Sequence, residues 1–292
     1  MVTARWRQRR VWKPSIRTID MEALYIAFVV IAILAVLYVL SVRGRTGHPD
    51  LHKLRGWNYA HRGLHSEGIP ENSMAAFRAS LAHGYGIELD VHLMADGNLA
   101  IIHDSALTRT TGVDGRIEDL TTAQLEDIRL EGTDEKIPLF SQVLDLYDGK
   151  APLIVELKPL GNNYNALCEK AVAMLDSYKG VYCLESFDPR CLLWLKKHRP
   201  DLIRGQLTEN YFLSKTSPLP WVLKFLLTHQ MGNFLTKPDF VAYRCSDRYT
   251  FSNTIARKLW KLHGVTWTLK DRQDYDNAIK EGWIPIFEGF EP

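Results

Sequence analysis

Ile87-Glu88-Leu89-Asp90-Val91-His92 alternates apolar with ionisable residues, and this alternation decides the fold class. Side chains on a β-strand point to opposite faces in turn, so a strand here places Glu88, Asp90 and His92 on one face. Two carboxylates side by side raise each other's pKa unless a cation lies between them. The stretch therefore predicts a strand whose polar face belongs to a functional site.

The same pattern returns farther along the chain. Leu153-Ile154-Val155-Glu156-Leu157-Lys158 places Glu156 and Lys158 on one face of a second strand, and Leu99-Ala100-Ile101-Ile102-His103-Asp104 is a strand-like run that ends in His-Asp. Other strand-like runs alternate with helix-like segments, at 57–61, 181–187, 202–207, 240–243, 265–269 and 284–287. Such alternation over about 235 residues predicts the α/β class with a parallel sheet, closed into a (β/α)8 TIM barrel.

Length and composition fit one large globular domain with an appendage: 292 residues, 46% hydrophobic and 24% charged. The formal net charge of +2 gives no indication of a nucleic-acid partner. The four cysteines show no CxxC spacing, so we expect buried small apolar side chains rather than a disulfide framework.

Residues 23–42 contain no charged residue and consist largely of Ile, Val, Leu and Ala. This length matches the roughly 20 residues that cross a bilayer as a helix. Tyr25 and Tyr38 lie near the ends, where interfacial aromatic residues are favoured. We expect an N-terminal transmembrane helix that anchors a single-pass membrane protein. The alternative is a cleaved signal peptide, whose apolar run is about 7–15 residues long and precedes a small-x-small cleavage site.

The chain thus divides into a basic N-terminal segment (1–22), a transmembrane helix (23–42), a linker (43–56) and the barrel (57–292). Six Lys and Arg residues precede the helix, and Arg43, Arg45, Lys53 and Arg55 follow it. The positive-inside rule favours an extracytoplasmic barrel, whereas the lack of a disulfide pattern favours the cytoplasmic side. The side of the membrane stays open.

Barrel enzymes carry active groups at the carboxyl ends of strands and in the loops that follow. His61, Glu88, Asp90, His103 and Glu156 fall at or near such ends. The three carboxylates suit a hard cation, Mg²⁺ or Ca²⁺, whereas zinc prefers more His or Cys ligands. Two histidines with an unperturbed pKa of about 6.5 can act as acid and base at neutral pH.

Several short motifs follow one another with a specific spacing. They are His61-Arg62-Gly63, Glu71-Asn72-Ser73, Glu88-Leu89-Asp90, His103-Asp104, Arg109-Thr110-Thr111-Gly112, Glu156-Leu157-Lys158, Ser186-Phe187 and Trp267-Thr268. This ordered set resembles the glycerophosphodiester phosphodiesterase family, from about Trp57 to the C-terminus. The chain departs from the family pattern at Lys270, where Asn is common, and at Phe287-Glu288-Gly289, where Thr-Asp is common.

The resemblance implies a distorted eightfold barrel and a divalent-metal-dependent hydrolase that splits glycerophosphodiesters into glycerol phosphate and an alcohol. It implies that Glu88, Asp90 and Glu156 bind the metal and that His61 and His103 are the catalytic acid and base. The residues implied in substrate or phosphate binding are Arg62, Lys158, Glu71, Asn72 and Trp267.

Two other functions stay open. The stretch 218–227 is unusually apolar, which fits either an inward-packed barrel helix or a membrane-facing one. With the anchor, the second alternative favours lysophospholipase D-type hydrolysis of membrane lysophospholipids at the same site. A catalytically inactive, membrane-tethered binding module fits less well, because all five metal and histidine positions are occupied by suitable residues.

Overall fold

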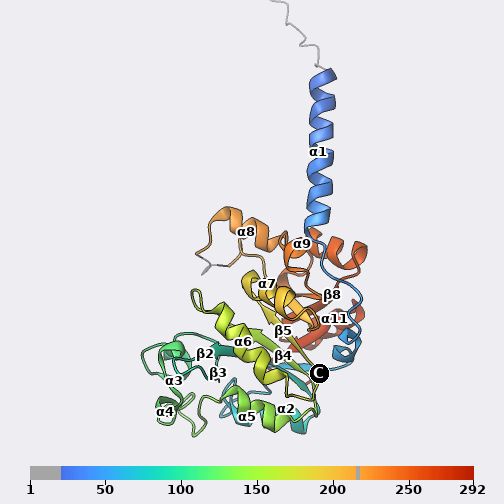
Figure 1. Ribbon diagram of the computed structural model, residues 1–292. Helices are drawn as coiled ribbons and strands as arrows, with labels where there is room; N and C mark the ends of the chain where they lie inside the picture. Colours follow the sequence, from blue (N-terminus) through green and yellow to red (C-terminus); the bar gives the residue numbers. More distant parts are fainter. Residues whose placement is uncertain (1–20, 215–217) are drawn as a thin grey trace, which may run out of the picture. The chain divides into compact units, whose positions relative to one another are not determined.

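The computed structural model describes residues 21–214 and 218–292, so the basic N-terminal segment lies almost entirely outside the described residues. The chain separates into two units, Met1–Tyr38 and Val39–Pro292. The described part of the first unit belongs to helix α1 (Met21–Ser41), coloured blue in Figure 1. This helix is long and apolar enough to cross a membrane, a property that it shares with signal sequences.

Eight parallel strands of the second unit close into a barrel. They pair in the order β1-β2-β4-β5-β6-β7-β8-β9, and β9 pairs with β1 to complete the ring. The strands are β1 (Tyr59–His61), β2 (Gly86–Leu93), β4 (Leu153–Leu157), β5 (Tyr182–Ser186), β6 (Arg204–Thr208), β7 (Phe240–Arg244), β8 (His263–Leu269) and β9 (Ile284–Phe287). The expected closed (β/α)8 barrel is confirmed.

A further strand, β3 (Leu99–Ile101), lies outside the ring and runs antiparallel to β2. Between the two strands Met94 N donates to Asn98 O, and Gly97 takes a φ of 80° that favours glycine. So short a turn reverses the chain, because a parallel crossover needs about a dozen residues or more. His103 therefore follows a hairpin strand, and our expectation that it lies at the end of a barrel strand is corrected.

Helices and short turns fill the connections between the strands (Figure 1). They are η1 (Leu51–Leu54), α2 (Met74–Ala82), α3 (Thr108–Thr111), η2 (Ile117–Asp119), α4 (Thr122–Leu125), α5 (Phe140–Tyr147), α6 (Tyr164–Leu175), α7 (Pro189–His198), α8 (Trp221–Thr228), α9 (Asn233–Thr236), η3 (Cys245–Asp247), α10 (Phe251–Thr254), the π-helical turn η4 (Ile255–Leu259) and α11 (Arg272–Lys280). Helix α2 begins with a Ser73 cap, whose Oγ accepts from Ala76 N at 3.1 Å.

Alternation along the strands separates an outer and an inner core. Leu89 and Val155 face outward into a cluster shared with the surrounding helices, whereas Ile154, Cys183 and Phe240 face inward. The next inward residue on β4 after Ile154 is Glu156, so the interior changes from apolar to acidic toward the carboxyl ends of the strands. All four cysteines are free and buried.

The segment expected as a linker, 43–56, packs into the barrel. Leu51 and Leu54 of η1 are buried in the same inner cluster as Phe240. Arg45 binds both carboxylate oxygens of Asp239, with Nε 2.6 Å from Oδ1 and Nη2 2.5 Å from Oδ2. We therefore propose that the barrel domain begins near Val39 rather than at residue 57.

Helix α8 turns most of its apolar side chains outward. Its exposed residues are Trp221, Val222, Leu223, Phe225 and Leu226, and Trp221 is 72% exposed. Thr228 is the buried residue of this helix. The stretch 218–227 is therefore a surface element of the barrel unit rather than an inward-packed helix.

We expect Leu54→Ala to lower the free energy of unfolding by about 2–5 kcal/mol, because it leaves a cavity in a packed interior. Lys53→Ala, on the exposed side of the same turn, removes a surface ion pair with Asp50 and should cost about 0–1 kcal/mol. Chemical denaturation of the two variants measures the difference. Equal stabilities would mean that η1 is a peripheral linker after all.

Candidate active site

Three carboxylates from neighbouring strands meet inside the barrel. Glu88 and Asp90 come from β2, and Glu156 of β4 pairs in register with Asp90. One oxygen of each lies within 4.8 Å of the others, and none of the three residues is more than 6% exposed. Burial raises the pKa of Glu88 and of Glu156, and the charge of Asp90 raises both further. Such a group of oxygen ligands is suited to a divalent cation.

Two basic side chains contact these carboxylates. Lys158 Nζ lies 3.1 Å from both Asp90 Oδ1 and Glu156 Oε1, and Arg62 Nε lies 3.6 Å from Asp90 Oδ2. Burial alone would raise the pKa of Asp90, but Lys158, His103 and Arg62 outweigh it and hold that pKa well below its usual range. Burial opposes the charge of Lys158, yet Asp90 and Glu156 raise its pKa, so it stays protonated. The site therefore holds two cations that can neutralise a phosphate.

His61, the last residue of β1, is oriented by Glu288. Its Nδ1 lies 2.6 Å from Glu288 Oε2, and its Nε2 lies 3.8 Å from Glu88 Oε2. Glu288 also accepts a hydrogen bond from Lys270 Nζ at 2.8 Å, so the two departures from the family pattern contact each other. Burial lowers the pKa of His61, although Glu288 opposes this, and His61 is therefore neutral at pH 7.

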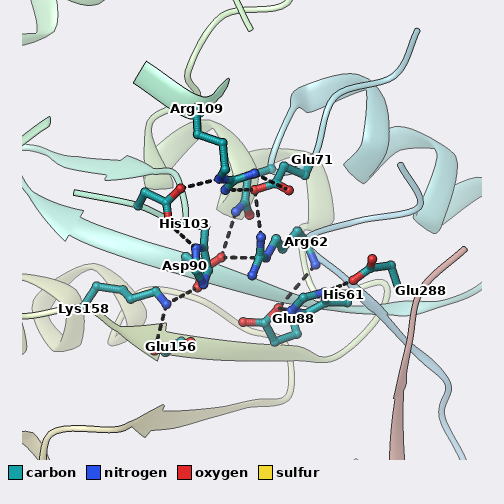
Figure 2. A network of polar contacts seen from close by, with 12 residues as sticks. His61, Arg62, Glu71, Glu88, Asp90, His103, Arg109, Glu156, Lys158 and Glu288 are labelled. Atoms are coloured by element: carbon teal, nitrogen blue, oxygen red, sulfur yellow. Dashed lines mark hydrogen bonds and ion pairs between the residues drawn. The ribbon is translucent and has the colours of Figure 1, made fainter. Parts of the chain in front are cut away.

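His103 is held by an ion-pair network that reaches Arg62 (Figure 2). His103 Nδ1 lies 2.6 Å from Asp104 Oδ1, and Arg109 joins Asp104 to Glu71. Glu71 also accepts from Arg62 Nη1 at 2.9 Å. The hydrogen bond from His103 and the charge of Arg109 hold the pKa of Asp104 well below its usual range. The network thus couples the orientation of His103 to that of Arg62.

The backbone is strained at two residues of the site. Arg62 and Asn72 have φ values of 56° and 54°, in the left-handed region that non-glycine residues seldom adopt. Arg62 N donates to Glu88 O at 3.0 Å, and Asn72 N donates to Arg62 O at 2.8 Å. Asn72 Nδ2 donates in turn to Asp90 Oδ2 at 2.8 Å. The strained turn therefore carries both side chains onto Asp90, as is common where strain is stored at functional sites.

A small cavity of about 30 Å³ opens among these residues. His61, His103, Glu88 and Glu156 line it together with Trp267. Trp267 Nε1 donates to Ala242 O at 3.1 Å, and its ring packs edge-on against Phe187 at 5.6 Å between centroids. Trp267 therefore forms a fixed apolar wall beside the charged groups.

Our sequence reasoning gave no role to Glu185, which lines the same cavity from β5. It is 1% exposed and pairs in register with Glu156, and its Oε2 has no hydrogen-bond partner among the residues described. Burial raises the pKa of Glu185 well above its usual range, and Glu156 adds to this shift. The alternation Cys183-Leu184-Glu185 carries the same signal as Ile154-Val155-Glu156 and could have identified it.

His92 and Arg109 are supporting residues that sequence reasoning also left without a role. His92 Nε2 lies 3.2 Å from the main-chain oxygen of His103, and its Nδ1 lies 2.6 Å from Glu118 Oε1. His92 therefore fixes the hairpin end that carries His103. These contacts join segments distant in the sequence, so only the fold reveals them.

Known proteins resemble this chain in sequence and in fold. Residues 61–284 match the model of the glycerophosphoryl diester phosphodiesterase family. A glycerophosphodiester phosphodiesterase of Caldanaerobacter subterraneus is 29% identical over 239 residues, which cover 76% of this chain and 89% of that protein. A lysophospholipase D of Rattus norvegicus is 32% identical over 133 residues, or 41% of each chain.

A solved structure shares the fold. A phosphodiesterase of Oleispira antarctica, in complex with its product sn-glycerol-3-phosphate, superposes with a TM-score of 0.67 at 22% identity. The superposition covers 81% of this chain and 94% of that one.

We expect Glu288→Gln to shift the acidic limb of the pH profile of phosphodiester hydrolysis to lower pH. The carboxylate raises the pKa of His61, so its removal lets burial lower that pKa further. Turnover should also fall, because the ring loses its fixed orientation. The measurement is kcat/KM against pH, with Glu291→Gln as a control that removes an exposed carboxylate from the same terminal segment. An unmoved or upward-shifted limb would show that Glu288 does not act on His61.

Proposed function

The chain belongs to the glycerophosphoryl diester phosphodiesterase family, and from that premise we propose that His61 and His103 hydrolyse a glycerophosphodiester to glycerol phosphate and an alcohol. The observation that carries the proposal is the convergence of two carboxylate-bonded histidines on one group of buried carboxylates and cations. Hydrolysis needs a neutralised anion, a proton acceptor for the nucleophile and a proton donor for the leaving alkoxide. This set of residues supplies all three.

We assign Glu88, Asp90 and Glu156 as the ligands of a divalent cation, Mg²⁺ or Ca²⁺. Their oxygens lie close enough together to share one ion, and the set contains no sulfur or nitrogen ligand. The unpartnered Oε2 of Glu185 beside Glu156 supports the assignment, because a buried oxygen without a donor fits a water held near a cation. When bound, the cation would polarise a phosphoryl oxygen.

The chain's own groups perform the remaining tasks. Arg62 and Lys158 bind the phosphate oxygens and offset the charge that develops in the transition state. His61, neutral at pH 7, accepts the proton of the nucleophile through Nε2, since Nδ1 is bonded to Glu288. His103 donates a proton to the leaving alkoxide, and Asp104 orients the ring through its contact with Nδ1.

Metal removal tests the first assignment. We expect EDTA to abolish release of choline from glycerophosphocholine, and Mg²⁺ or Ca²⁺ to restore it. Glu156→Gln should weaken cation binding at least tenfold by calorimetry, as loss of a charged ligand does. Full turnover after exhaustive chelation would overturn the metal site.

Histidine substitution tests the second assignment. His61→Ala and His103→Ala should each lower kcat by about 10²-fold or more, the contribution of a lost acid or base. Cation binding should persist in both, because neither residue is assigned as a ligand. His198→Ala on the surface of α7 serves as the control and should leave kcat near normal. Near-normal turnover of His61→Ala would rule out the two-histidine mechanism.

A second candidate substrate is a membrane lysophospholipid. The specific observation that favours it is the exposed apolar face of α8, since such a face suits contact with a lipid surface. The similarity to a lysophospholipase D supports the same choice. We propose that α1 remains on the protein as a membrane anchor and that α8 makes a second contact with the bilayer.

The triple change Trp221→Ser, Phe225→Ser and Leu226→Ser separates the two substrates. We expect it to lower hydrolysis of lysophosphatidylcholine in vesicles severalfold and to leave glycerophosphocholine hydrolysis unchanged, because α8 supplies no catalytic group. Leu193→Ser with Ile279→Ser, two exposed apolar residues elsewhere, is the matched control. Equal loss on both substrates would show that α8 supports the barrel rather than lipid binding.

A further inference from the structure

A cavity of about 680 Å³ lies outside the barrel and away from the catalytic groups. Its walls are η4, the start of β8 and the turn before β9. His263 and Gly264 line it at the amino end of β8, whereas Trp267 lines the catalytic cavity farther along the same strand. The two cavities therefore open at opposite ends of β8, and this volume is in the range of small-molecule sites.

Cationic side chains dominate the lining. They are Arg55, Arg248, Arg257, Lys258 and Lys261, with Glu281 as the carboxylate among the lining residues. Glu281 is already engaged, because it bonds Tyr249 Oη, Trp283 Nε1 and Arg248 Nε. In the described ranges 21–214 and 218–292, no carboxylate lies within 4.0 Å of Arg55, Arg257, Lys258 or Lys261. The cavity therefore carries an excess of positive charge that the protein itself does not neutralise.

Arg257 is fixed at the centre of this wall. Its Cζ lies over the Trp283 ring, 3.7 Å from the centroid, and Nη2 donates to Glu281 O at 2.8 Å. Arg55 and Arg257 converge on Gly282, since a Cβ there would lie 3.8 and 3.9 Å from their Nη2 atoms. Burial lowers the pKa of Arg257 to about 10, and repulsion from Arg55 adds to the effect. Two neighbouring guanidinium groups, of which Arg257 is held in place, are suited to the oxygens of a phosphate.

The same wall adjoins the end of the apolar helix. Trp260, which follows η4, donates from Nε1 to Val39 O at 2.8 Å, and Arg43 stacks over its ring at 4.9 Å. Gly44 approaches so closely that a Cβ would lie 2.6 Å from Leu262, a residue of the cavity wall. The cavity wall is therefore next to the residues at which a membrane-spanning α1 would leave the bilayer.

We propose that this cavity binds the phosphate of an anionic phospholipid headgroup at the membrane surface. Basic pockets beside membrane-spanning segments recognise such headgroups through the same groups found here. The unpaired cations support phosphate as the group that is bound. That this phosphate belongs to a lipid rests on the proposed membrane anchor. The site stands apart from the catalytic residues, so it would retain or orient the enzyme on an anionic membrane without taking part in hydrolysis.

The test uses the full chain in detergent micelles that contain phosphatidylglycerol or phosphatidylcholine, with bound lipid measured by native mass spectrometry. Arg55→Gln with Lys258→Gln removes two exposed cations of the cavity and should preserve the fold. Lys150→Gln with Lys179→Gln removes two exposed cations elsewhere and is the matched control. We expect the cavity variant to retain phosphatidylglycerol about tenfold less than the control, with phosphatidylcholine weakly retained by both.

The outcomes separate the alternatives. Equal retention of phosphatidylglycerol by the two variants would overturn the proposal. Displacement of phosphatidylglycerol by millimolar inorganic phosphate would overturn the lipid as ligand and identify a site for free phosphate. Hydrolysis of glycerophosphocholine, measured in parallel, should be the same in both variants, so failure of the catalytic assignments would be recognised independently.

Discussion

The structure depends on the way in which the barrel accommodates four carboxyl groups away from water. Glu88, Asp90, Glu156 and Glu185 are all nearly buried, and unpaired charges in such surroundings cost of the order of several kcal/mol per ion. Lys158 offsets two of them directly. The remaining carboxyl groups favour a bound cation, and the turn that carries Arg62 onto Asp90 takes a left-handed backbone conformation. The fold thus stores an electrostatic imbalance that a bound metal would relieve.

The two histidines stand in different surroundings around that acidic centre. His61 is enclosed and bonded to a carboxylate from the last segment of the chain, whereas His103 is partly exposed and bonded to its sequence neighbour. Burial lowers the pKa of His61, and the hydrogen bond from His103 helps to hold the pKa of Asp104 well below its usual range. These different surroundings support the roles that we propose for them, with His61 as proton acceptor and His103 as proton donor. His103 follows a hairpin strand outside the barrel ring, and its side chain is more exposed than that of His61.

Much of the barrel could be predicted from the sequence, because strand alternation is a local property. Glu88, Asp90 and Glu156 stand out for that reason. The antiparallel direction of β3 was not predicted, because the sequence of a strand does not show which strand it pairs with. Leu51 and Leu54 looked like linker residues, because too short a stretch surrounds them to show a pattern. The contact between Lys270 and Glu288 joins two loops and is visible only in three dimensions.

That contact has a consequence for how this enzyme tolerates sequence change. Glu288 bonds both His61 and Lys270, so replacing either Lys270 or Glu288 changes the charge balance around His61. A change at either residue therefore reaches His61, the residue that we propose as proton acceptor. Residues 270 and 288 should therefore be exchanged together when the rim of this barrel is grafted onto a relative or an ancestral sequence is built.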